Sequence, residues 1–441
     1  MTAGSPAPTG SFVDPDVNQP FRKIAVYFGL AALAVRFGVL PELLYTITGG
    51  SNLYLLYFTV LPATAASLLT GGLRRSFRGK APYWWMLYVG WIAIAIPFSS
   101  WPGGSMQLLS SYARTDLVFI LIAGGIAVQW NEIRLMYYTI GATTILNLLT
   151  ARFFSDNSSG RIELTASTTI GNSNDLAAHL LLVLPFLLFV VLDPKRSLII
   201  RVPLMLAIIY GINVILGTAS RGGLIALMFG LAFMLFFATP TQRVIAIGSG
   251  VMLTFLFLAV LPSNALHRLG NLFGEEHEEA KESGESRSYL FKTSLRYTYQ
   301  HPLFGVGPGQ FPNYEGQQRV TEGKVGNWHE THCVFTEVSA ENGIPALIFF
   351  LGALVAAVVP VLRVHKKARK MGNVEVKNAC FCFLLGTLCY LVAVTFLSHA
   401  YSFYFPVLIG MAGTLSFVAN QQLEARGGAQ MPPRPLAPNY A

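Results

Sequence analysis

The chain has 441 residues, of which 53% are hydrophobic and only 12% are charged, and its formal net charge is +9. Soluble domains carry about a quarter charged residues, so this composition excludes an ordinary soluble protein and indicates that much of the surface faces lipid. Three of the four cysteines lie in one apolar run, "CFCFLLGTLC", and the fourth stands alone. Their placement implies no disulfide framework.

Residues 1–22 read as a disordered cytoplasmic tail without a cleaved signal peptide, because no basic stretch is followed directly by a short apolar core. Beyond this tail, apolar segments of about 20 residues, the length that crosses a bilayer core, predict an all-α polytopic membrane protein. About twelve spans are expected, near residues 24–40, 52–70, 83–99, 114–130, 132–150, 174–192, 198–217, 222–239, 243–261, 343–362, 378–397 and 402–420. Spans 1–9 thus occupy residues 23–261, a large helical loop occupies 262–342, spans 10–12 occupy 343–421, and a second disordered tail occupies 422–441.

Charges in the connecting segments predict the orientation. When the N-terminus faces the cytoplasm, connections on that side, such as "GGLRRSFRGKAP" and "RVHKKARKMGNVEVK", are rich in lysine and arginine. The opposite connections before the sixth span contain only Arg152 and Arg161. Because lysine and arginine gather on the cytoplasmic side of membranes, both termini are predicted to be cytoplasmic. The loop 262–342 then lies on the outer face.

Ionisable residues inside spans usually face the interior of a bundle and are candidates for function. In the sixth span, Asp175 and His179 are one helical turn apart, so they can share a face and pair near the outer surface. A purely structural hydrogen bond explains them equally well. His399 and Tyr401, at the outer end of the last pair of spans, are weaker candidates of the same kind.

Arg221 interrupts an apolar run in "GTASRGGLIAL", which predicts a tight connection between two spans on the outer side. An arginine near the end of a span can simply extend to the membrane interface. Its neighbours are all small, however, so another group can approach the guanidinium. Guanidinium is always charged and binds phosphate oxygens through paired donors. This position therefore suits a lipid-linked phosphate whose tail lies in the bilayer.

Arg287 begins a segment of the outer loop, "SRSYLFKTSLRYTYQ", whose spacing predicts a helix that Pro302 ends. Alone it would be an ordinary loop arginine. The helix leads into Gly305, Gly307 and Gly309, which permit positive φ and close approach of the backbone. This glycine run lacks the context of a Rossmann fingerprint and the Gly-Lys-Ser/Thr of a Walker A loop.

The loop also carries "HETHC", in which His329 and His332 are three residues apart, so a helix would place them on roughly one face. The spacing differs from the H-E-x-x-H of zinc proteases, and no third ligand is evident, so no metal site is predicted. One histidine acting as a general base fits better, because neutral imidazole accepts a proton near pH 7. Cys333 has no partner to make it a nucleophile. Glu341 is either an orienting group or a charge at the start of a helix.

In this order, "GNSNDLAAHLLLVLP", "TASRGGLIAL", "SRSYLFKTSLRYTYQHPLFGVGPGQF" and "THCVFTEVSAENGIPALIFF" resemble the O-antigen ligase and polymerase superfamily over about residues 165–360. The resemblance implies a membrane glycosyltransferase of the GT-C type in the bacterial inner membrane. Such an enzyme moves a glycan from undecaprenyl diphosphate to an acceptor hydroxyl on the periplasmic face, and it requires no cofactor, metal or nucleotide sugar. The implied partners are the lipid-linked donor and a glycan or lipid A core acceptor, with no nucleic acid.

The resemblance also assigns roles to single residues. The family's two diphosphate-binding arginines correspond to Arg221 and Arg287, and its loop histidine corresponds to His332. The spacing from this histidine to the following glutamate, Glu341, matches the family pattern. A cysteine replaces the usual polar neighbour of the histidine, which leaves open whether His329 shares its role.

A polytopic transporter or flippase of lipid-linked sugars is the alternative of a different class. It would explain many spans and arginines near the membrane, yet it needs no outer loop of about 80 residues that carries arginine and histidine. An intramembrane hydrolase lacks a credible nucleophile or metal set. Among glycosyltransferases, the acceptor distinguishes a ligase (lipid A core) from a polymerase (another lipid-linked chain) or a protein O-glycosylating enzyme, and the sequence leaves all three open.

Overall fold

A computed structural model describes residues 21–50, 53–156, 161–164, 170–237, 278–326 and 328–429. Most of these residues are helical, and the only strands among them form a short antiparallel pair, β1 (Ser155–Asp156) with β2 (Glu163–Leu164). The helices are α1 (Arg22–Phe37), α2 (Leu40–Ile47), α3 (Leu55–Leu69), α4 (Gly72–Ser76), α5 (Ala81–Ala95), α6 (Pro102–Tyr112), α7 (Phe119–Gly125), α8 (Trp130–Phe153), α9 (Ser173–Val191), α10 (Leu198–Gly217), α11 (Arg221–Phe237), α14 (Glu278–Gln300), α15 (Phe311–Thr321), α16 (Val334–Lys370), α17 (Val374–Ala393) and α18 (Tyr404–Ala429). The prediction of an all-α architecture is confirmed.

Six helical segments among the described residues are long and apolar enough to cross a membrane. They are Ala81–Phe98, Pro102–Gly125, Ser173–Val191, Leu198–Gly217, Val334–Lys370 and Val374–Phe396. A seventh results if α1 and α2, which meet at 64°, form one broken span, whereas α3 and α11 are apolar but shorter. The chain is therefore a multi-pass membrane protein, and the predicted number of twelve spans is not confirmed. The predicted span 243–261 lies outside the described residues.

The residues between the predicted spans 83–99 and 114–130 were expected to form a connection, but they are mostly helical and belong to the apolar segment Pro102–Gly125. Residues Pro102–Tyr112 form α6, and the π-helical turn Ala113–Leu117 joins α6 to α7. Pro102 occupies the first position of the helix, where its missing N–H has no partner to lose. Glycine and serine are weak helix formers, so α6 depends on tertiary contacts such as the hydrogen bond from Ser105 to the carbonyl of Pro308.

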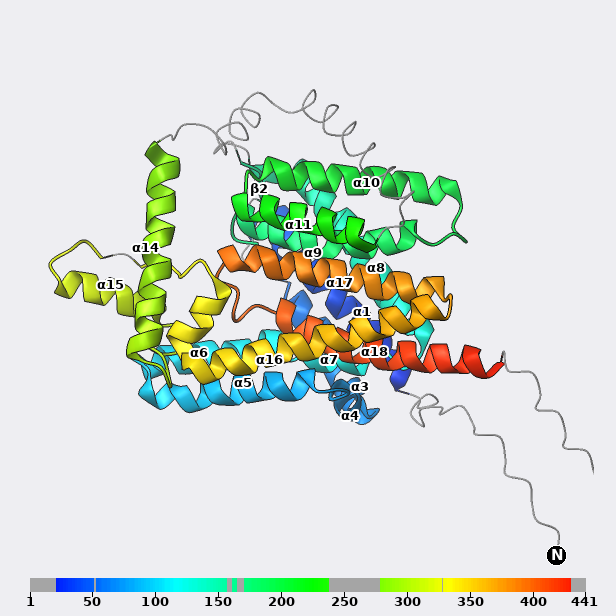
Figure 1. The fold of residues 1–441 in the computed structure, drawn as a ribbon, viewed down its shortest axis with the longest axis horizontal. Coiled ribbons are helices and arrows are strands. Elements are labelled where there is room, and N and C mark those ends of the chain that lie inside the picture. Colours follow the sequence, from blue (N-terminus) through cyan, green and yellow to red (C-terminus); the bar gives the residue numbers. More distant parts are fainter. Residues whose placement is uncertain are drawn as a thin grey trace, which may run out of the picture.

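Most helices of the bundle run roughly side by side, and α9 lies between α11 and α17 (Figure 1). Almost every side chain of α9 is buried, and α9 packs against α8, α10, α11 and α17. Gly386 of α17 permits this packing, because a Cβ there would lie 2.5 Å from the carbonyl oxygen of Leu182. A helix that is apolar all round is typically buried in this way.

Charged side chains pair at one end of the bundle. Arg22 at the start of α1 pairs with Glu132 at the start of α8, and Lys367 near the end of α16 pairs with Glu424 of α18. Arg134 of α8 pairs with Glu375 at the start of α17. Several connections predicted to be cytoplasmic therefore meet at the same end. That this end faces the cytoplasm stays a prediction.

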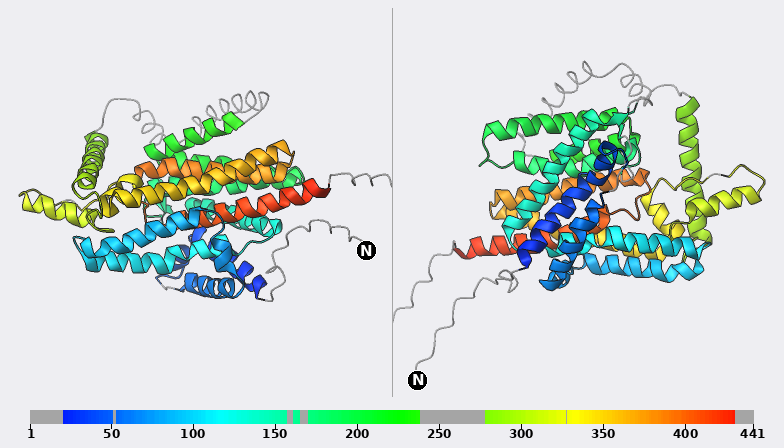
Figure 2. Two further views of the ribbon diagram at one scale, coloured as in Figure 1. Left: turned by 60° about the horizontal axis from the view of Figure 1, so that its bottom comes forward. Right: turned by 180° about the vertical axis from the view of Figure 1, so that it is seen from behind.

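The described part of the predicted outer loop, within residues 278–342, lies at the opposite end, which is called the outer end after that prediction. There α14 stands across the ends of the bundle helices and α15 projects beside it (Figures 1 and 2). This part has a small apolar core of its own, made of Leu290, Tyr297, Val306, Phe311 and Ala340. These residues come from α14, the glycine turn, α15 and the first part of α16. The core therefore fixes the loop helices against the bundle.

Candidate functional site

The glycine turn that follows α14 fits into a break in α16. Gly343 has φ +83° within that helix, and a Cβ there would lie 2.0 Å from the carbonyl oxygen of Leu303. The N–H of Val306 donates to the carbonyl of Ala340 at 2.9 Å. All three glycines of the turn have positive φ: Gly305 (67°), Gly307 (117°) and Gly309 (70°). The predicted positive φ and close approach are thus confirmed, because only glycine adopts such conformations without strain.

Glu341 lies buried in the first part of α16, where its carboxylate holds the turn. It accepts hydrogen bonds from the N–H groups of Gly309 (2.8 Å) and Phe311 (3.1 Å) and from the hydroxyl of Tyr401 (2.7 Å). A carboxylate with three donors is a strong, directional anchor. Glu341 therefore joins the glycine turn to residues 397–403, the outer segment between α17 and α18.

His332 lies in a non-helical stretch between α15 and α16, and its backbone has φ +54°. Its N–H donates to the hydroxyl of Ser398 at 2.9 Å, and that hydroxyl is 3.3 Å from the hydroxyl of Thr331. Residues 329–332 form no helix, so the shared helical face that such a helix would give His329 and His332 does not occur. His332 is partly buried, whereas His329 is exposed.

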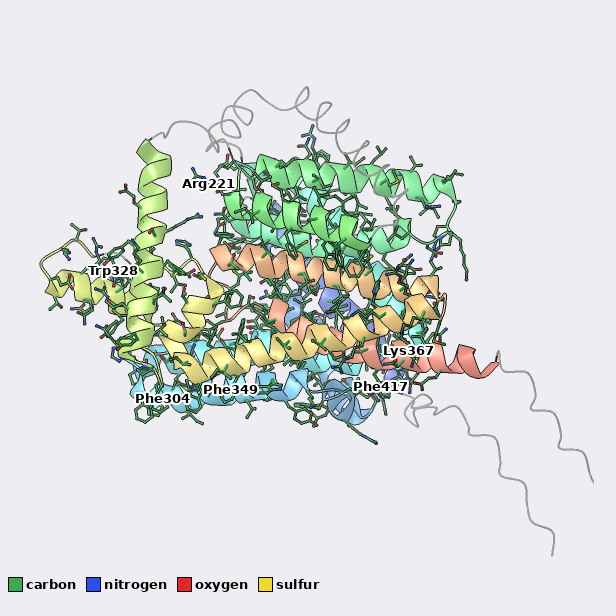
Figure 3. The ribbon with its side chains drawn as sticks, viewed as in Figure 1. Arg221, Phe304, Trp328, Phe349, Lys367 and Phe417 are labelled. Atoms are coloured by element: carbon green, nitrogen blue, oxygen red, sulfur yellow. The ribbon has the colours of Figure 1, made fainter. Side chains whose placement is uncertain are left out.

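Arg221 is the first residue of α11 and lies at the end of the bundle nearest α14 (Figure 3). The hydroxyl of Ser220 accepts a hydrogen bond from the N–H of Gly223 at 3.1 Å, which caps the helix. A Cβ on Gly223 would lie 2.8 Å from Cβ of Ala177 in α9. The small residues around the arginine thus let α11 pack closely on α9, and the guanidinium itself is exposed.

The charges of the site act on one another. Burial and the charge of Arg221 lower the pKa of Arg287, which lies within α14 rather than at its start. Burial, Arg287 and His329 lower the pKa of His332, and Asp175 acts in the opposite direction. Arg221 therefore lies within electrostatic range of Arg287, and Arg287, His329 and Asp175 each lie within electrostatic range of His332. Across the described residues, neither Arg221 nor Arg287 pairs with a carboxylate.

Asp175 does not pair with His179, so that prediction is wrong. Asp175 Oδ1 lies 3.1 Å from His399 Nε2, and the other ring nitrogen of His399 lies 2.9 Å from the hydroxyl of Tyr390. The carboxylate also accepts from the N–H of Gly171 at 3.1 Å. Asp175 thereby fixes the start of α9 against the 397–403 segment, within electrostatic range of His332.

His179 is instead fully buried inside the bundle. Its Nδ1 lies 2.8 Å from the hydroxyl of Tyr404, and its Nε2 lies 2.7 Å from the side-chain nitrogen of Asn147. The same nitrogen of Asn147 donates to the carbonyl of Phe37 at 2.9 Å. With both ring nitrogens occupied in the core, His179 joins helices and lies outside the candidate site.

Three further polar residues of this region were missed by the sequence analysis. The first is Ser398, whose hydroxyl accepts the hydrogen bond from the N–H of His332. The second is Glu330, whose pKa is raised by partial desolvation and by the charge of Asp175. Arg161 donates to the carbonyl of Thr218 and to the side-chain oxygen of Asn174, both at 3.0 Å. A signal for Arg161 did exist, since it is one of the few cations in the outer connections.

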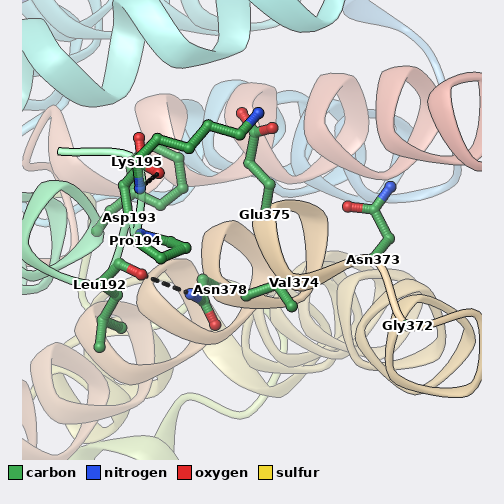
Figure 4. Close-up of a pocket in the computed structure, with 10 residues that line it drawn as sticks. Leu192, Asp193, Pro194, Lys195, Gly372, Asn373, Val374, Glu375 and Asn378 are labelled. Carbon is green, nitrogen blue, oxygen red and sulfur yellow. Dashed lines mark hydrogen bonds between the residues drawn. The ribbon is translucent and has the colours of Figure 1, made fainter.

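A pocket of about 210 Å³ at the other end of the bundle is lined in part by Lys195, Glu375 and Asn378 (Figure 4). Asn378 donates to the carbonyl of Leu192 at 3.3 Å. This pocket opens between the turn after α9 and the start of α17, where the charged pairs gather. It is separated from Arg221 and Asp175 by the length of α9, so it takes no part in the candidate site.

Arg221 and Arg287 suit an anionic ligand, and the imidazole of His332 suits the removal of a proton from a hydroxyl group. Groups of three or more His, Cys, Asp or Glu residues placed to hold a metal ion do not occur in the described part of the chain. Residues 206–351, about a third of the chain, match the family model described as O-antigen ligase. This match includes Arg221, Arg287 and His332. No curated protein matches the chain.

Proposed function

We propose that the chain is a member of the O-antigen ligase and polymerase superfamily, because residues 206–351 match the family model described as O-antigen ligase. It would then transfer a glycan from undecaprenyl diphosphate to an acceptor hydroxyl on the periplasmic face of the bacterial inner membrane. The acceptor is a lipid A core sugar for a ligase or the end of another lipid-linked glycan for a polymerase. Its fold would then be of the GT-C type, with both termini in the cytoplasm.

The observation that carries the proposal is the pair of guanidinium groups, Arg221 and Arg287. They lie close enough for one to lower the pKa of the other, and no carboxylate of the described residues compensates them. Two like charges held together favour a ligand with concentrated negative charge. A lipid diphosphate at the membrane boundary supplies this charge, and each guanidinium can bind its oxygens through paired donors.

In the proposed reaction, His332 accepts the proton of the acceptor hydroxyl. Its lowered pKa keeps the imidazole neutral at pH 7, as a general base requires. The acceptor oxygen attacks the anomeric carbon opposite the diphosphate, and the bond from that carbon to the diphosphate oxygen breaks. The electron pair leaves with the diphosphate, whose growing charge Arg221 and Arg287 stabilise. Attack from the opposite face inverts the anomeric configuration, and none of these steps uses a metal.

The test uses purified protein with a lipid-linked glycan and an acceptor, and it measures covalent transfer. Replacing Arg221 or Arg287 with alanine is expected to slow transfer by roughly 10²–10³, and His332→Ala by roughly 10²–10⁴. Arg296→Ala is the matched control, because Arg296 is exposed on the same helix as Arg287 and lies over the ring of Tyr297. Unchanged transfer in all three site variants would remove the proposal.

A further inference from the structure

A second cavity, of about 420 Å³, opens on the outer end of the protein between α6 and the glycine turn with α15. This volume lies in the range of small-molecule sites, about 300–1,000 Å³. Its lining includes aromatic rings, amides and hydroxyls: Trp101, Gln107, Ser111, Gln310, Asn313 and Tyr401. Among the described residues that line it, none is lysine or arginine.

This lining differs in chemistry from the arginine site. Amide side chains both donate and accept hydrogen bonds, as a ring of sugar hydroxyls requires. Aromatic rings present flat apolar faces on which the C–H faces of a pyranose can stack. The one charged residue of the lining is the acidic Asp116, which pairs with Arg36 at 2.7 Å. A neutral polyhydroxylated ligand therefore fits this cavity better than a phosphate.

The walls of the cavity are held in place. A Cβ on Gly104 would lie 2.6 Å from the ring of Trp101 and 2.9 Å from Nε2 of Gln310, so the glycine makes room for both side chains. Ser105 donates to the carbonyl of Pro308 at 2.9 Å and thereby ties α6 to the glycine turn. The indole is still 57% exposed. It therefore rests against α6 and leaves surface available for a ligand.

The cavity and the candidate site share two structural elements. Tyr401 lines the cavity and donates to Glu341, and His399 in the same segment pairs with Asp175. Gly309 of the glycine turn also lines the cavity. In addition, α6 passes into the π-helical turn at Ala113–Leu117, a geometry that often marks functional sites. The 397–403 segment thus connects the cavity to Asp175 and Glu341 of the candidate site.

We propose that this cavity binds a pyranose unit of a glycan, next to the unit that takes part in transfer. Trp101 is the stacking platform, and the exposed Asn313, whose side-chain nitrogen donates to the buried Gln310 at 3.0 Å, is a hydroxyl partner. The inference rests on the proposed function for the identity of the glycan. The sugar can belong to the donor or to the acceptor, since the chemistry of recognition is shared.

Binding is measured by saturation-transfer NMR with two phosphate-free probes. One is the glycan released from the lipid-linked donor by mild acid, and the other is the oligosaccharide of the acceptor freed of its lipid. Trp101→Ala and Asn313→Ala are expected to weaken binding of one probe by about tenfold or more, and Trp101→Phe by less than about threefold. The probe affected identifies the source of the sugar. Tyr299→Ala, which removes an exposed ring of α14, is the control and should bind as wild type does.

Unchanged affinity for both probes in Trp101→Ala and Asn313→Ala overturns the inference and assigns Trp101 to anchoring at the membrane interface, where tryptophan is common. Equal loss in Tyr299→Ala overturns it as well, because binding would then be non-specific. The probes carry no diphosphate leaving group and cannot serve as donors, so their binding is measured without any transfer reaction. A wild-type protein that binds a probe through Trp101 and transfers no lipid-linked glycan would refute the proposed function and leave the cavity assignment standing.

Discussion

Replacing Glu341 with glutamine tests the contact that joins the outer loop to the bundle. One oxygen of the carboxylate accepts from the N–H of Phe311, and the other accepts from the N–H of Gly309 and the hydroxyl of Tyr401. A glutamine offers one accepting oxygen and one donating nitrogen. The hydroxyl can turn to accept from that nitrogen, but the two backbone N–H groups cannot. Either orientation of the amide therefore leaves one buried N–H facing another donor.

The size of the effect follows from this geometry. An unsatisfied buried donor costs about 1–3 kcal/mol, and the bonds that remain change from charged to neutral, which weakens each by about 1 kcal/mol. Removing a buried charge recovers part of the loss. We expect the glycine turn to open more easily by about 2–4 kcal/mol, which corresponds to a roughly 30- to 10³-fold larger open population.

Hydrogen–deuterium exchange of peptides that cover residues 305–314 measures this population directly, because local opening exposes the amides of Gly309 and Phe311. Exchange in Glu341→Gln should be faster by the factor given above. Glu424→Gln is the matched control, since its exposed pair with Lys367 contributes at most about 1 kcal/mol. Wild-type exchange rates in the Glu341 variant would show that the three hydrogen bonds do not hold the turn.

Other predictions concern the pH dependence of transfer and the break in α16. Arg287→Gln removes a charge that lowers the pKa of His332, so the acidic limb of the kcat/KM–pH profile should move to higher pH. Asp175→Asn removes a charge that raises the same pKa, so the limb should move to lower pH; shifts in the same direction would contradict the assignment of His332 as the base. Gly343→Ala should lower the thermal midpoint of detergent-solubilised protein sharply, since its φ of +83° and the contact with the 303 carbonyl leave no room for a methyl group. Gly90→Ala, where a Cβ meets nothing within 4 Å, should be neutral or raise the midpoint slightly, and an equal loss in both variants would refute the steric argument.

The sequence predicted regular helices well where an apolar run has clear ends. The predicted span 198–217 coincides with α10, because Ser197 precedes the run and the small polar residues from Thr218 follow it. The sequence did not predict α6, because the glycines and serines of Pro102–Tyr112 are poor helix formers. That helix is stabilised by contacts with the turn at Pro308, about two hundred residues further along the chain, which no local pattern reveals.

For the candidate site, the residues themselves were easier to predict than the residues with which they form hydrogen bonds. Arg221 stands out from its small and apolar neighbours, whereas Arg287 and His332 lie in a polar loop and were singled out by the family resemblance. The pairing of Asp175 with His399 joins positions 224 residues apart, whereas His179 is four residues away and looked the obvious partner. The backbone of His332 likewise depends on Ser398, 66 residues away. Long-range contacts of this kind override local spacing.

The backbone of His332 has one more consequence. At φ +54° a side chain costs about 1–2 kcal/mol relative to a conformation that L-residues prefer, and glycine would pay almost none of it. For folding stability alone, glycine would be favoured over histidine at this position. A His332→Gly variant is therefore expected to have a slightly higher thermal midpoint than the wild type and, on the proposed role of the imidazole as general base, to lose transfer.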